Sequence, residues 1–336
     1  MVASAGNDDA ERAEQGAASE RPLVAELDQR ERPVLITGIC GRLGRRLARA
    51  LHRECRVVGL DRRQFVGCPK DIHAYQLDVR RKKTKDVFRQ ERPVALVHLG
   101  ALHDLRASPG EHHTWNVVGL QRLMEYAAQY GVSKIVVLSS ANVYGPRPDN
   151  PQFLDEDAPL LGSESFSAVR DLVEIDMLAQ SFFWKHPEVE TVILRPAHIL
   201  GPVRNAPSNY LRQNVVPTLL GFDPMIQVIH HDDVIRAIRL ALRSDARGIF
   251  NIAGPPPAQL SRIVELTGRT RLTLPHTLLR MALERLWRLH ATSFPAQELD
   301  FIRYVCMVDD ARARHELGFV PEHDLATTVA AVDDYD

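Results

Sequence analysis

Short apolar runs alternate with longer segments of helical spacing from residue 33 to about residue 195. The apolar runs are typical of buried strands and lie at 33–37, 57–60, 74–77, 94–99, 134–138 and 191–194. Between them, apolar residues recur at helical spacing over 42–52, 81–90, 111–130 and 165–185. Strands that are separated by helices of this length form βαβ units. The sequence therefore predicts an α/β fold with a doubly wound parallel sheet.

Three glycines follow the first predicted strand and open the first predicted helix. Gly38, Gly41 and Gly44 stand three residues apart, a spacing that permits a tight turn, close approach of a pyrophosphate and close packing of helix on strand. The free N–H groups at the start of the helix favour a bound phosphate. The next strand ends in Asp61, 17 residues after Gly44, close to the spacing of about 20 for a carboxylate that binds ribose hydroxyls. The pattern predicts a Rossmann-type dinucleotide site, with loop contacts from Thr37, Gly38, Gly41, Arg42, Leu43 and Gly44.

The charges around this loop bear on the choice of cofactor. Asp61 favours NAD, because its carboxylate would repel the 2′-phosphate of NADP. Arg62 and Arg63 follow it directly and Arg42 lies in the glycine loop, which keeps NADP as an alternative. Asp78, just after the third strand, is a candidate partner of the adenine amino group, with a solvated turn residue as the alternative.

Changes in local composition divide the chain into three parts. The first segment is acidic, with too few apolar residues to offset its ordering entropy. After residue 196, Pro and Gly become frequent and strands sparser. Folds of this kind place their ligand crevice at the carboxyl ends of the strands. We therefore expect a disordered tail over 1–32, a dinucleotide-binding domain over 33–200 with strands returning around 226–254, and a smaller C-terminal substrate lobe over 201–225 and 255–330.

A series of short motifs continues beyond the glycine loop. They are Asp78-Val79, His98-Leu99-Gly100-Ala101, Asn116-Val-Val-Gly119, Leu138-Ser139-Ser140-Ala-Asn-Val-Tyr-Gly145, Leu194-Arg195-Pro196, Ile229-His-His-Asp-Asp-Val234, Phe250-Asn-Ile-Ala-Gly254 and Glu316-Leu-Gly-Phe-Val-Pro321. With these motifs the chain resembles an extended short-chain dehydrogenase/reductase of the NAD-dependent epimerase/dehydratase family over roughly 33–325. The resemblance implies an NAD-loaded sheet, a Ser–Tyr–Lys catalytic set and a nucleotide-sugar in the smaller lobe.

The resemblance also assigns roles to single residues. Ser140, four residues before Tyr144, takes the position of the catalytic serine, which hydrogen-bonds the substrate oxygen at the carbon that exchanges hydride. An ordinary loop hydroxyl is the alternative for Ser140. Beyond the glycine loop and Asp61, the cofactor contacts implied by the motifs are Asp78, Val79, Leu99, Gly100, Ala101, Asn116, Ser139, Arg170 and Pro196.

The catalytic Tyr-x-x-x-Lys of the family is altered in this chain. At the expected distance after Ser140 stand Phe166 and Arg170. Phenylalanine has no ionisable group, so it cannot move the proton that accompanies hydride transfer, whereas Arg170 can still hold the nicotinamide ribose. The literal match Tyr130-Gly-Val-Ser-Lys134 precedes Ser140, so it has the wrong topological place and is interpreted as coincidental.

A substitute for the missing tyrosine can be sought among nearby titratable residues. His198 stands where relatives carry an asparagine that contacts the sugar-nucleotide, and histidine is a competent acid or base near neutral pH. A packed histidine is the favoured alternative for His198. His103, Tyr144 and Glu164 are weaker candidates.

Two further features of the sequence concern the ligand. In the UDP-sugar epimerases an arginine three residues before the Ile-His motif binds the diphosphate, and here Ile226 takes that position, which disfavours a UDP-sugar. The pairs His112-His113 and His230-His231 lack a third ligand at familiar spacing, so no metal is expected.

The substitution at Phe166 leaves two classes of function open. One is an NAD-dependent epimerase, dehydratase or dehydrogenase in which Ser140, Arg170 and His198 or a bound water act. The other is a catalytically silent dinucleotide-binding protein that serves as a sensor or an assembly partner. The retained serine favours the enzyme. The resemblance further implies a homodimer through the helices at 111–130 and 165–185.

Composition excludes several other classes. The formal net charge of -1, from 42 basic and 43 acidic residues, argues against a general nucleic-acid binder. No apolar run reaches the ~18 residues of a membrane span, and the apolar-rich segment 278–290 is interpreted as a core helix of the lobe rather than a contact for lipid or a partner. The N-terminus lacks the pattern of a secretory signal, and the four cysteines show no CxxC pairing. We expect a cytoplasmic globular protein.

Overall fold

The computed structural model describes residues 32–100, 109–164, 167–203, 205–243, 245–289 and 296–334. Its centre is a seven-stranded, wholly parallel sheet in the order β11-β6-β5-β4-β1-β2-β3. The strands are β1 (Val34–Thr37), β2 (Val57–Asp61), β3 (His73–Gln76), β4 (Ala95–His98), β5 (Lys134–Leu138), β6 (Glu190–Pro196) and β11 (Gly248–Ile252). The order reverses between β1 and β4, which is where a doubly wound sheet opens its crevice. The predicted fold class is confirmed.

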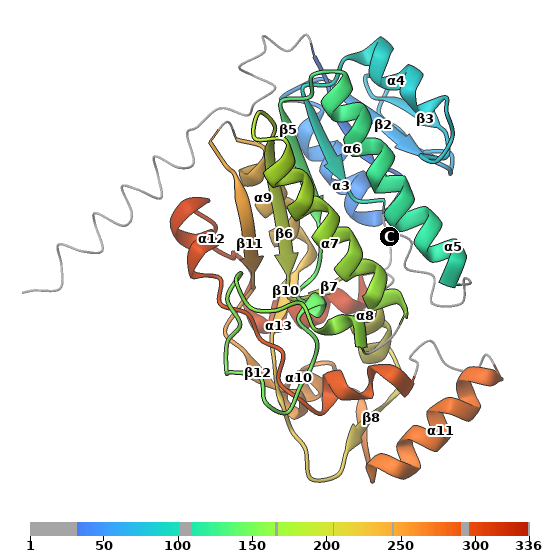
Figure 1. Ribbon diagram of the computed structural model, residues 1–336. Coiled ribbons are helices and arrows are strands. Elements are labelled where there is room, and N and C mark those ends of the chain that lie inside the picture. Colours follow the sequence, from blue (N-terminus) through green and yellow to red (C-terminus); the bar gives the residue numbers. More distant parts are fainter. Residues whose placement is uncertain are drawn as a thin grey trace, which may run out of the picture.

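Helices cover both faces of the sheet (Figure 1). Successive side chains of a strand point to opposite faces, so Val34 and Ile36 join one hydrophobic core while Leu35 joins the other. The first core receives residues from α3 (Arg42–Leu51), α9 (His231–Ala241) and α12 (Ala311–Glu316), and the second from α4 (Thr84–Glu91), α6 (Gly119–Gln129) and α7 (Ser167–Lys185). Burial on both faces explains why these strands are continuous apolar runs rather than alternating ones.

The predicted helix at 111–130 is present and contains one irregular turn. It consists of α5 (Pro109–His113), a π-helical turn η1 (Thr114–Val118) and α6. Such turns are rare and occur frequently at functional sites. Asn116 lies in this turn, is buried, and donates from its amide to the Asp171 carboxylate of α7 at 3.3 Å. The predicted helix is therefore confirmed, and its π-helical turn ties it to α7.

A smaller lobe lies beyond the carboxyl ends of the strands (Figure 1). Its strand pairs are β7 (His198–Leu200) with β10 (Val228–His230), β8 (Val215–Leu219) with β13 (Thr270–Leu274), and β9 (Met225–Ile226) with β12 (Ala258–Gln259). Its helices are α8 (Ala206–Leu211), α10 (Leu260–Leu266), α11 (His276–Arg288) and α13 (Leu325–Ala330), with 3-10 turns, among them η4 (Ala296–Ile302). One stretch of the expected lobe packs elsewhere, because Ala313, Leu317 and Phe319 join the core of the large sheet.

The apolar-rich helix α11 is only half buried. Leu279 and Leu283 pack into the core of the lobe, whereas Leu278, Met281 and Leu289 are 52%, 52% and 76% exposed. The interpretation of this segment as a core helix holds for one face only. Within the described ranges, each helix is too short or too polar to cross a bilayer.

A buried ion pair links the strands to α7 beneath the carboxyl edge of the sheet. Arg195 of β6 and Asp176 of α7 are 1% and 0% exposed. The guanidinium donates from Nη2 to Oδ1 at 2.7 Å and from Nε to Oδ2 at 2.9 Å. Ser139, which follows β5, donates its hydroxyl to the same carboxylate at 2.6 Å. The pair therefore fixes the end of β5 and the helix α7 against β6.

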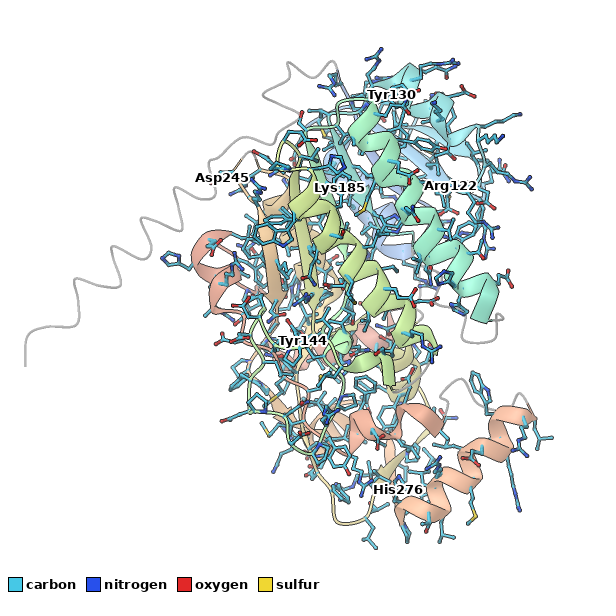
Figure 2. All side chains as sticks on the ribbon, in the orientation of Figure 1. Arg122, Tyr130, Tyr144, Lys185, Asp245 and His276 are labelled. Atoms are coloured by element: carbon cyan, nitrogen blue, oxygen red, sulfur yellow. The ribbon has the colours of Figure 1, made fainter. Side chains whose placement is uncertain are left out.

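The same arginine extends the network to the edge strand β11. Its Nη1 donates to the hydroxyl of Tyr144 at 2.7 Å, and that hydroxyl donates to Asn251 of β11 at 2.8 Å. Figure 2 labels Tyr144 at the junction of the sheet and the lobe. Glu156 accepts from the backbone N–H of Asn251 at 2.8 Å. These bonds satisfy the polar groups that the ion pair brings into the interior.

Replacing Asp176 with alanine should strongly destabilise the fold. The change leaves the Arg195 guanidinium buried without its counter-charge, and the loss of one partner of a buried pair costs about 3–5 kcal/mol of unfolding free energy. Urea denaturation followed by circular dichroism measures the effect. On the same helix, Glu174 is half-exposed and pairs with the exposed His113, so Glu174→Ala should cost less than about 1 kcal/mol. Equal denaturation midpoints for the two variants would contradict the role of the pair.

Candidate active site

The glycine loop between β1 and α3 is packed so closely that larger residues do not fit. Gly38 has φ +74°, and a Cβ built on it would lie 2.7 Å from the carbonyl oxygen of Leu99. A Cβ on Gly44 would lie 2.4 Å from the carbonyl oxygen of Gly38. Leu99 and Gly100 follow β4 and remain partly exposed at this edge. The predicted glycines therefore bring two loop backbones and the start of α3 close together at one edge of the sheet.

The start of α3 is open to an anion. Its N-cap is Gly41, no side chain caps it, and its first turn contains no acidic residue. Arg42, Leu43 and Gly44 form this first turn. N–H groups at a helix start and the positive end of the helix dipole favour a phosphate. The residues present therefore fit the pyrophosphate of a dinucleotide.

Asp61 closes this edge at the end of β2. Its carboxylate is 6% exposed and accepts from the backbone N–H of Cys40 at 3.0 Å. It also accepts from the backbone N–H, the Nε and the Nη2 of Arg63, at 2.9, 3.0 and 3.0 Å. The carboxylate thus binds the glycine loop directly. A ribose that used Asp61 would have to share it with Arg63 or displace the guanidinium.

The thiol of Cys40 is not a reactive group in this loop. Burial, followed by the negative charge of Asp61, raises its pKa to about 11. Since the thiolate is the reactive form, the start of the helix does not activate this cysteine.

Trp115 is a part of the site that sequence reasoning missed. It is 8% exposed and donates its indole N–H to the carbonyl oxygen of Gly100 at 2.8 Å. The guanidinium carbons of Arg62 and Arg80 lie 4.9 and 4.8 Å from its ring centroid. Its place directly before Asn116 was the available signal. The indole and its two arginines form a cationic, aromatic wall next to the loop after β4.

Asp78 lies beside this wall and is engaged by Arg80. Its carboxylate accepts from the backbone N–H of Arg80 at 2.9 Å and from Nη2 at 2.6 Å. Burial raises the pKa of Asp78, but the hydrogen bonds and the charge of Arg80 outweigh it, and the net shift is downward. The side chain is therefore an ionised acceptor, the form that an adenine amino group needs.

Several predicted cofactor residues have buried side chains. Thr37 is 0% exposed and its hydroxyl bonds to His98 Nδ1 at 2.8 Å. Val79 packs in the core, Pro196 is buried at the end of β6, and the Ser139 hydroxyl is engaged by Asp176. At these positions a ligand can contact backbone atoms or be positioned by the packing, but it cannot use the side-chain polar groups. Ala101 lies outside the described residues.

Ser140 keeps its donor available. It follows β5 and caps a short turn by accepting from the backbone N–H of Asn142 at 3.1 Å. Because its oxygen acts as acceptor in that bond, the hydroxyl hydrogen can point to a substrate oxygen. Arg170 lies in the first turn of α7 with its side chain exposed. Phe166 and His103 lie outside the described residues, as does the side chain of Glu164.

Tyr144 and the coincidental Tyr130–Lys134 match lie apart from the proposed site. The Tyr144 hydroxyl is engaged by Arg195 and Asn251, and the residue is 1% exposed, so it is wrong as a substitute base. Lys134 begins β5, at the opposite end of the strand from Ser140, and its ammonium is buried against the Glu190 carboxylate at 3.0 Å. Figure 2 shows Tyr130 at the far end of the molecule from Tyr144. The literal Tyr130–Lys134 match is therefore not part of the site.

A pocket lies between the loop after β5 and the lobe. Asn142, two residues after Ser140, forms part of its wall, together with His198 of β7 and Glu298 of η4. Sequence reasoning predicted His198 here and missed Glu298, which comes from a segment without a family motif. The remaining wall is mostly apolar.

Burial changes the titration of both ionisable groups in this pocket. It lowers the pKa of His198 to about 4 and raises the pKa of Glu298 to about 8. At neutral pH the imidazole is therefore uncharged, and the carboxyl group is mostly protonated. The His198 ring meets the Phe301 ring edge-on, with centroids 5.8 Å apart. A neutral, packed His198 is a poor proton donor, whereas Glu298 can donate a hydrogen bond.

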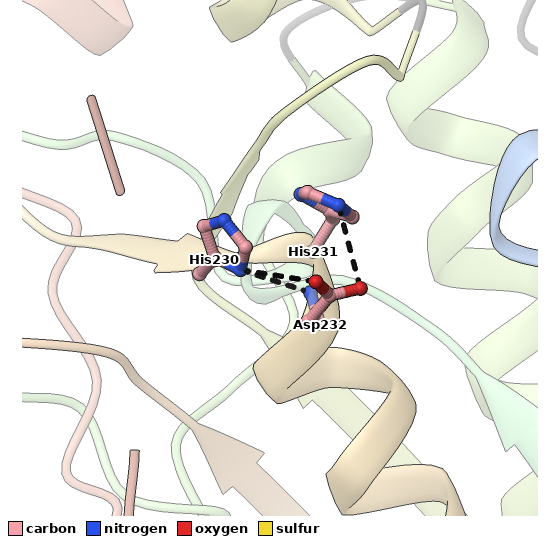
Figure 3. A group of neighbouring side chains, drawn as sticks. All are labelled: His230, His231 and Asp232. Atoms are coloured by element: carbon pink, nitrogen blue, oxygen red, sulfur yellow. Dashed lines mark hydrogen bonds and ion pairs between the residues drawn. The ribbon is translucent and has the colours of Figure 1, made fainter. Parts of the chain in front are cut away.

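Histidines of both adjacent pairs lie close to carboxylates in the folded structure, which their spacing in the sequence did not predict. Possible ligand atoms of His230, His231 and Asp232 lie within 4.8 Å of one another (Figure 3), as do those of His113, Asp171 and Glu174. In the first group, His230 Nδ1 accepts from the backbone N–H of Asp232 at 3.2 Å and so caps α9. Asp232 also pairs with Arg46 at 3.1 Å, a cation that opposes a metal ion. The absence of a metal stays a prediction.

Comparisons with known proteins agree with this geometry. An uncharacterized protein of Mycobacterium tuberculosis is 28% identical over 326 residues, covering 93% of this chain and 85% of the relative. A 3-diazoavenalumate denitrifying reductase of a Streptomyces species is 27% identical, covering 86% and 96%. The crystal structure of a UDP-glucuronic acid 4-epimerase from Bacillus cereus, in complex with UDP-glucuronic acid and NAD, has a TM-score of 0.70 at 19% identity, covering 90% and 98%. The model of the NAD dependent epimerase/dehydratase family matches residues 34–253. Since this match spans more than half of the chain, the protein belongs to the NAD-dependent epimerase/dehydratase family, as its motifs suggested.

Proposed function

We propose that this protein is an NAD-dependent oxidoreductase acting at a hydroxyl- or carbonyl-bearing carbon, with a proton relay that differs from that of its family. The observation that carries the proposal is the uncapped start of α3 beside the buried carboxylate of Asp61. The nicotinamide, when bound, supplies or accepts the hydride. The Bacillus cereus epimerase of the same fold was solved with NAD, and the Streptomyces relative is named as a reductase.

Residues at different positions of the site have different roles in this proposal. The start of α3 binds the pyrophosphate, and Asp61 selects ribose hydroxyls over a 2′-phosphate. The cationic, aromatic wall of Trp115, Arg62 and Arg80 lies beside the adenine. Ser140 donates its hydroxyl to the substrate oxygen, and Arg170 takes the place of the lysine that holds the nicotinamide ribose.

The division of the chain follows from the same arrangement. The sheet domain binds the dinucleotide and the lobe supplies the substrate pocket, so the substrate reaches the site from the side of the lobe. We retain a homodimer through α6 and α7 and a cytoplasmic location as parts of the proposal.

A second candidate is a dinucleotide-binding protein without catalysis. The phenylalanine at the position of the family's tyrosine favours it, because no ionisable group is present there. Such a protein would bind the cofactor but would not convert any substrate, and this difference in turnover separates the two candidates.

The variant Asp61→Asn should weaken NAD binding. The loss of a charged acceptor costs about 1.5–3 kcal/mol, which corresponds to roughly 10- to 150-fold in Kd. NADP binding should not weaken, because the change removes a repulsion of the 2′-phosphate and leaves Arg62 and Arg63 in place. Calorimetric titration of cofactor-stripped protein with both dinucleotides measures this. As a control, Asp71→Asn removes an exposed carboxylate that pairs with His52 and should leave both affinities unchanged. Equal loss for NAD and NADP would refute the role given to Asp61.

The variant Ser140→Ala should lower turnover about 10- to 100-fold, because the substrate oxygen loses a hydrogen bond that strengthens as charge develops on it. The readout is the absorbance of reduced nicotinamide with a panel of alcohols, ketones and UDP-sugars. Ser133→Ala, at the other end of β5, is the matched control and should match wild type. Tight NAD binding by wild type with no turnover on any member of the panel would favour the silent candidate.

A further inference from the structure

The walls of the pocket between the sheet and the lobe are mostly apolar. Leu200, Leu211, Val228, Leu260, Ile263 and Phe301 are among the residues that line it. One of its polar members is already satisfied, because the Tyr210 hydroxyl donates to the carbonyl oxygen of Pro217 at 2.6 Å. A cavity of this composition gains free energy by burying apolar surface of a ligand.

The same pocket is a poor place for a diphosphate. Among the described residues that line it there is no lysine or arginine. Ile226, at the position where the UDP-sugar epimerases resembled by this chain carry their diphosphate-binding arginine, forms part of the wall. A doubly charged group buried here would lose its hydration without gaining a counter-charge. The carboxyl group of Glu298 would add repulsion when it is ionised.

Glu298 is the unexplained group of the pocket. Its side chain lies at the pocket wall and is only 9% exposed. Within the described ranges, no hydrogen bond or ion pair engages its carboxyl group. A buried carboxyl group without a protein partner is costly unless a ligand or water satisfies it.

We propose that this pocket binds an apolar ring or chain compound with a single oxygen function, and that Glu298 hydrogen-bonds to that oxygen. This inference rests on the proposed function, in which the compound is the alcohol or ketone that exchanges hydride. Its one oxygen has two lone pairs and so accepts from both Ser140 and Glu298. The pKa of Glu298, about 8 through burial, makes the carboxyl group a donor at neutral pH, so a carbonyl oxygen is its natural partner. The wall then selects for apolar substrates, and Glu298 selects the position of their oxygen.

The test uses 2-decalone, an apolar bicyclic ketone, and UDP-glucose as probes in calorimetric titrations of the full chain. We expect 2-decalone to bind and UDP-glucose to bind more weakly. Binding of 2-decalone should be constant at low pH and weaken as the pH rises through about 8, because the carboxylate formed there cannot donate. Tighter binding of UDP-glucose, or no binding of 2-decalone, would overturn the inference.

Three variants assign the effect to Glu298. Glu298→Ala should weaken 2-decalone binding about tenfold through the loss of one hydrogen bond. Glu298→Gln keeps an N–H donor and does not titrate, so it should bind 2-decalone well at all pH values. Glu284→Gln, on the exposed face of α11, is the matched control and should retain both affinity and pH dependence. An unchanged pH profile in Glu298→Gln would overturn the role of Glu298.

Titration with NAD in the same samples separates this inference from the proposed function. NAD binding without 2-decalone binding would overturn the inference about the pocket and leave the proposed function standing. If 2-decalone binds but NAD does not, the ligand class proposed for the pocket is supported. The proposed function, on which the chemistry of the pocket rests, is then refuted.

Discussion

The buried pair between Arg195 and Asp176 is the interaction on which the rest of the site depends. It joins β6 to α7 in an interior where a lone charge would be costly, and through Ser139 and Tyr144 it fixes both ends of the loop that carries Ser140. The same helix α7 presents Arg170 one turn from its start. The network is thus a scaffold beneath the site. Its polar groups hydrogen-bond to one another and hold the loops in place, so they do not take part in the reaction.

The two regions that we propose as one site have opposite character. The end near β1, β2 and β3 is cationic and hydrogen-bonding, with the start of α3, Asp61 and the arginines around Trp115. The end near the lobe is apolar, with a protonated Glu298 and a neutral His198. A charged dinucleotide fits the first and an uncharged molecule fits the second. The motifs of the family lie at the first end, and two of the chain's departures from the family, His198 and Ile226, line the second.

The sequence predicted those features that depend on local pattern. Six strands and the glycine loop were readable because continuous apolar runs and glycine spacing are set by neighbours in the chain. The π-helical turn at Thr114–Val118 and the exposed face of α11 were not, because tertiary contacts decide them. Trp115 and Glu298 escaped prediction for the same reason: each acquires its role from residues distant in the sequence. His198 was placed correctly in the crevice, but its charge state depends on burial that no spacing reveals.

The central claim is that the glycine loop and the apolar pocket are two ends of one site. A crystal structure of the protein soaked with NAD tests it directly. The account predicts the pyrophosphate at the start of α3, the adenosine ribose at Asp61 with Arg63 shifted or sharing the carboxylate, and the nicotinamide next to Ser140 at the mouth of the pocket that contains Glu298. A dinucleotide bound elsewhere, or a nicotinamide separated from that pocket by protein, would contradict it.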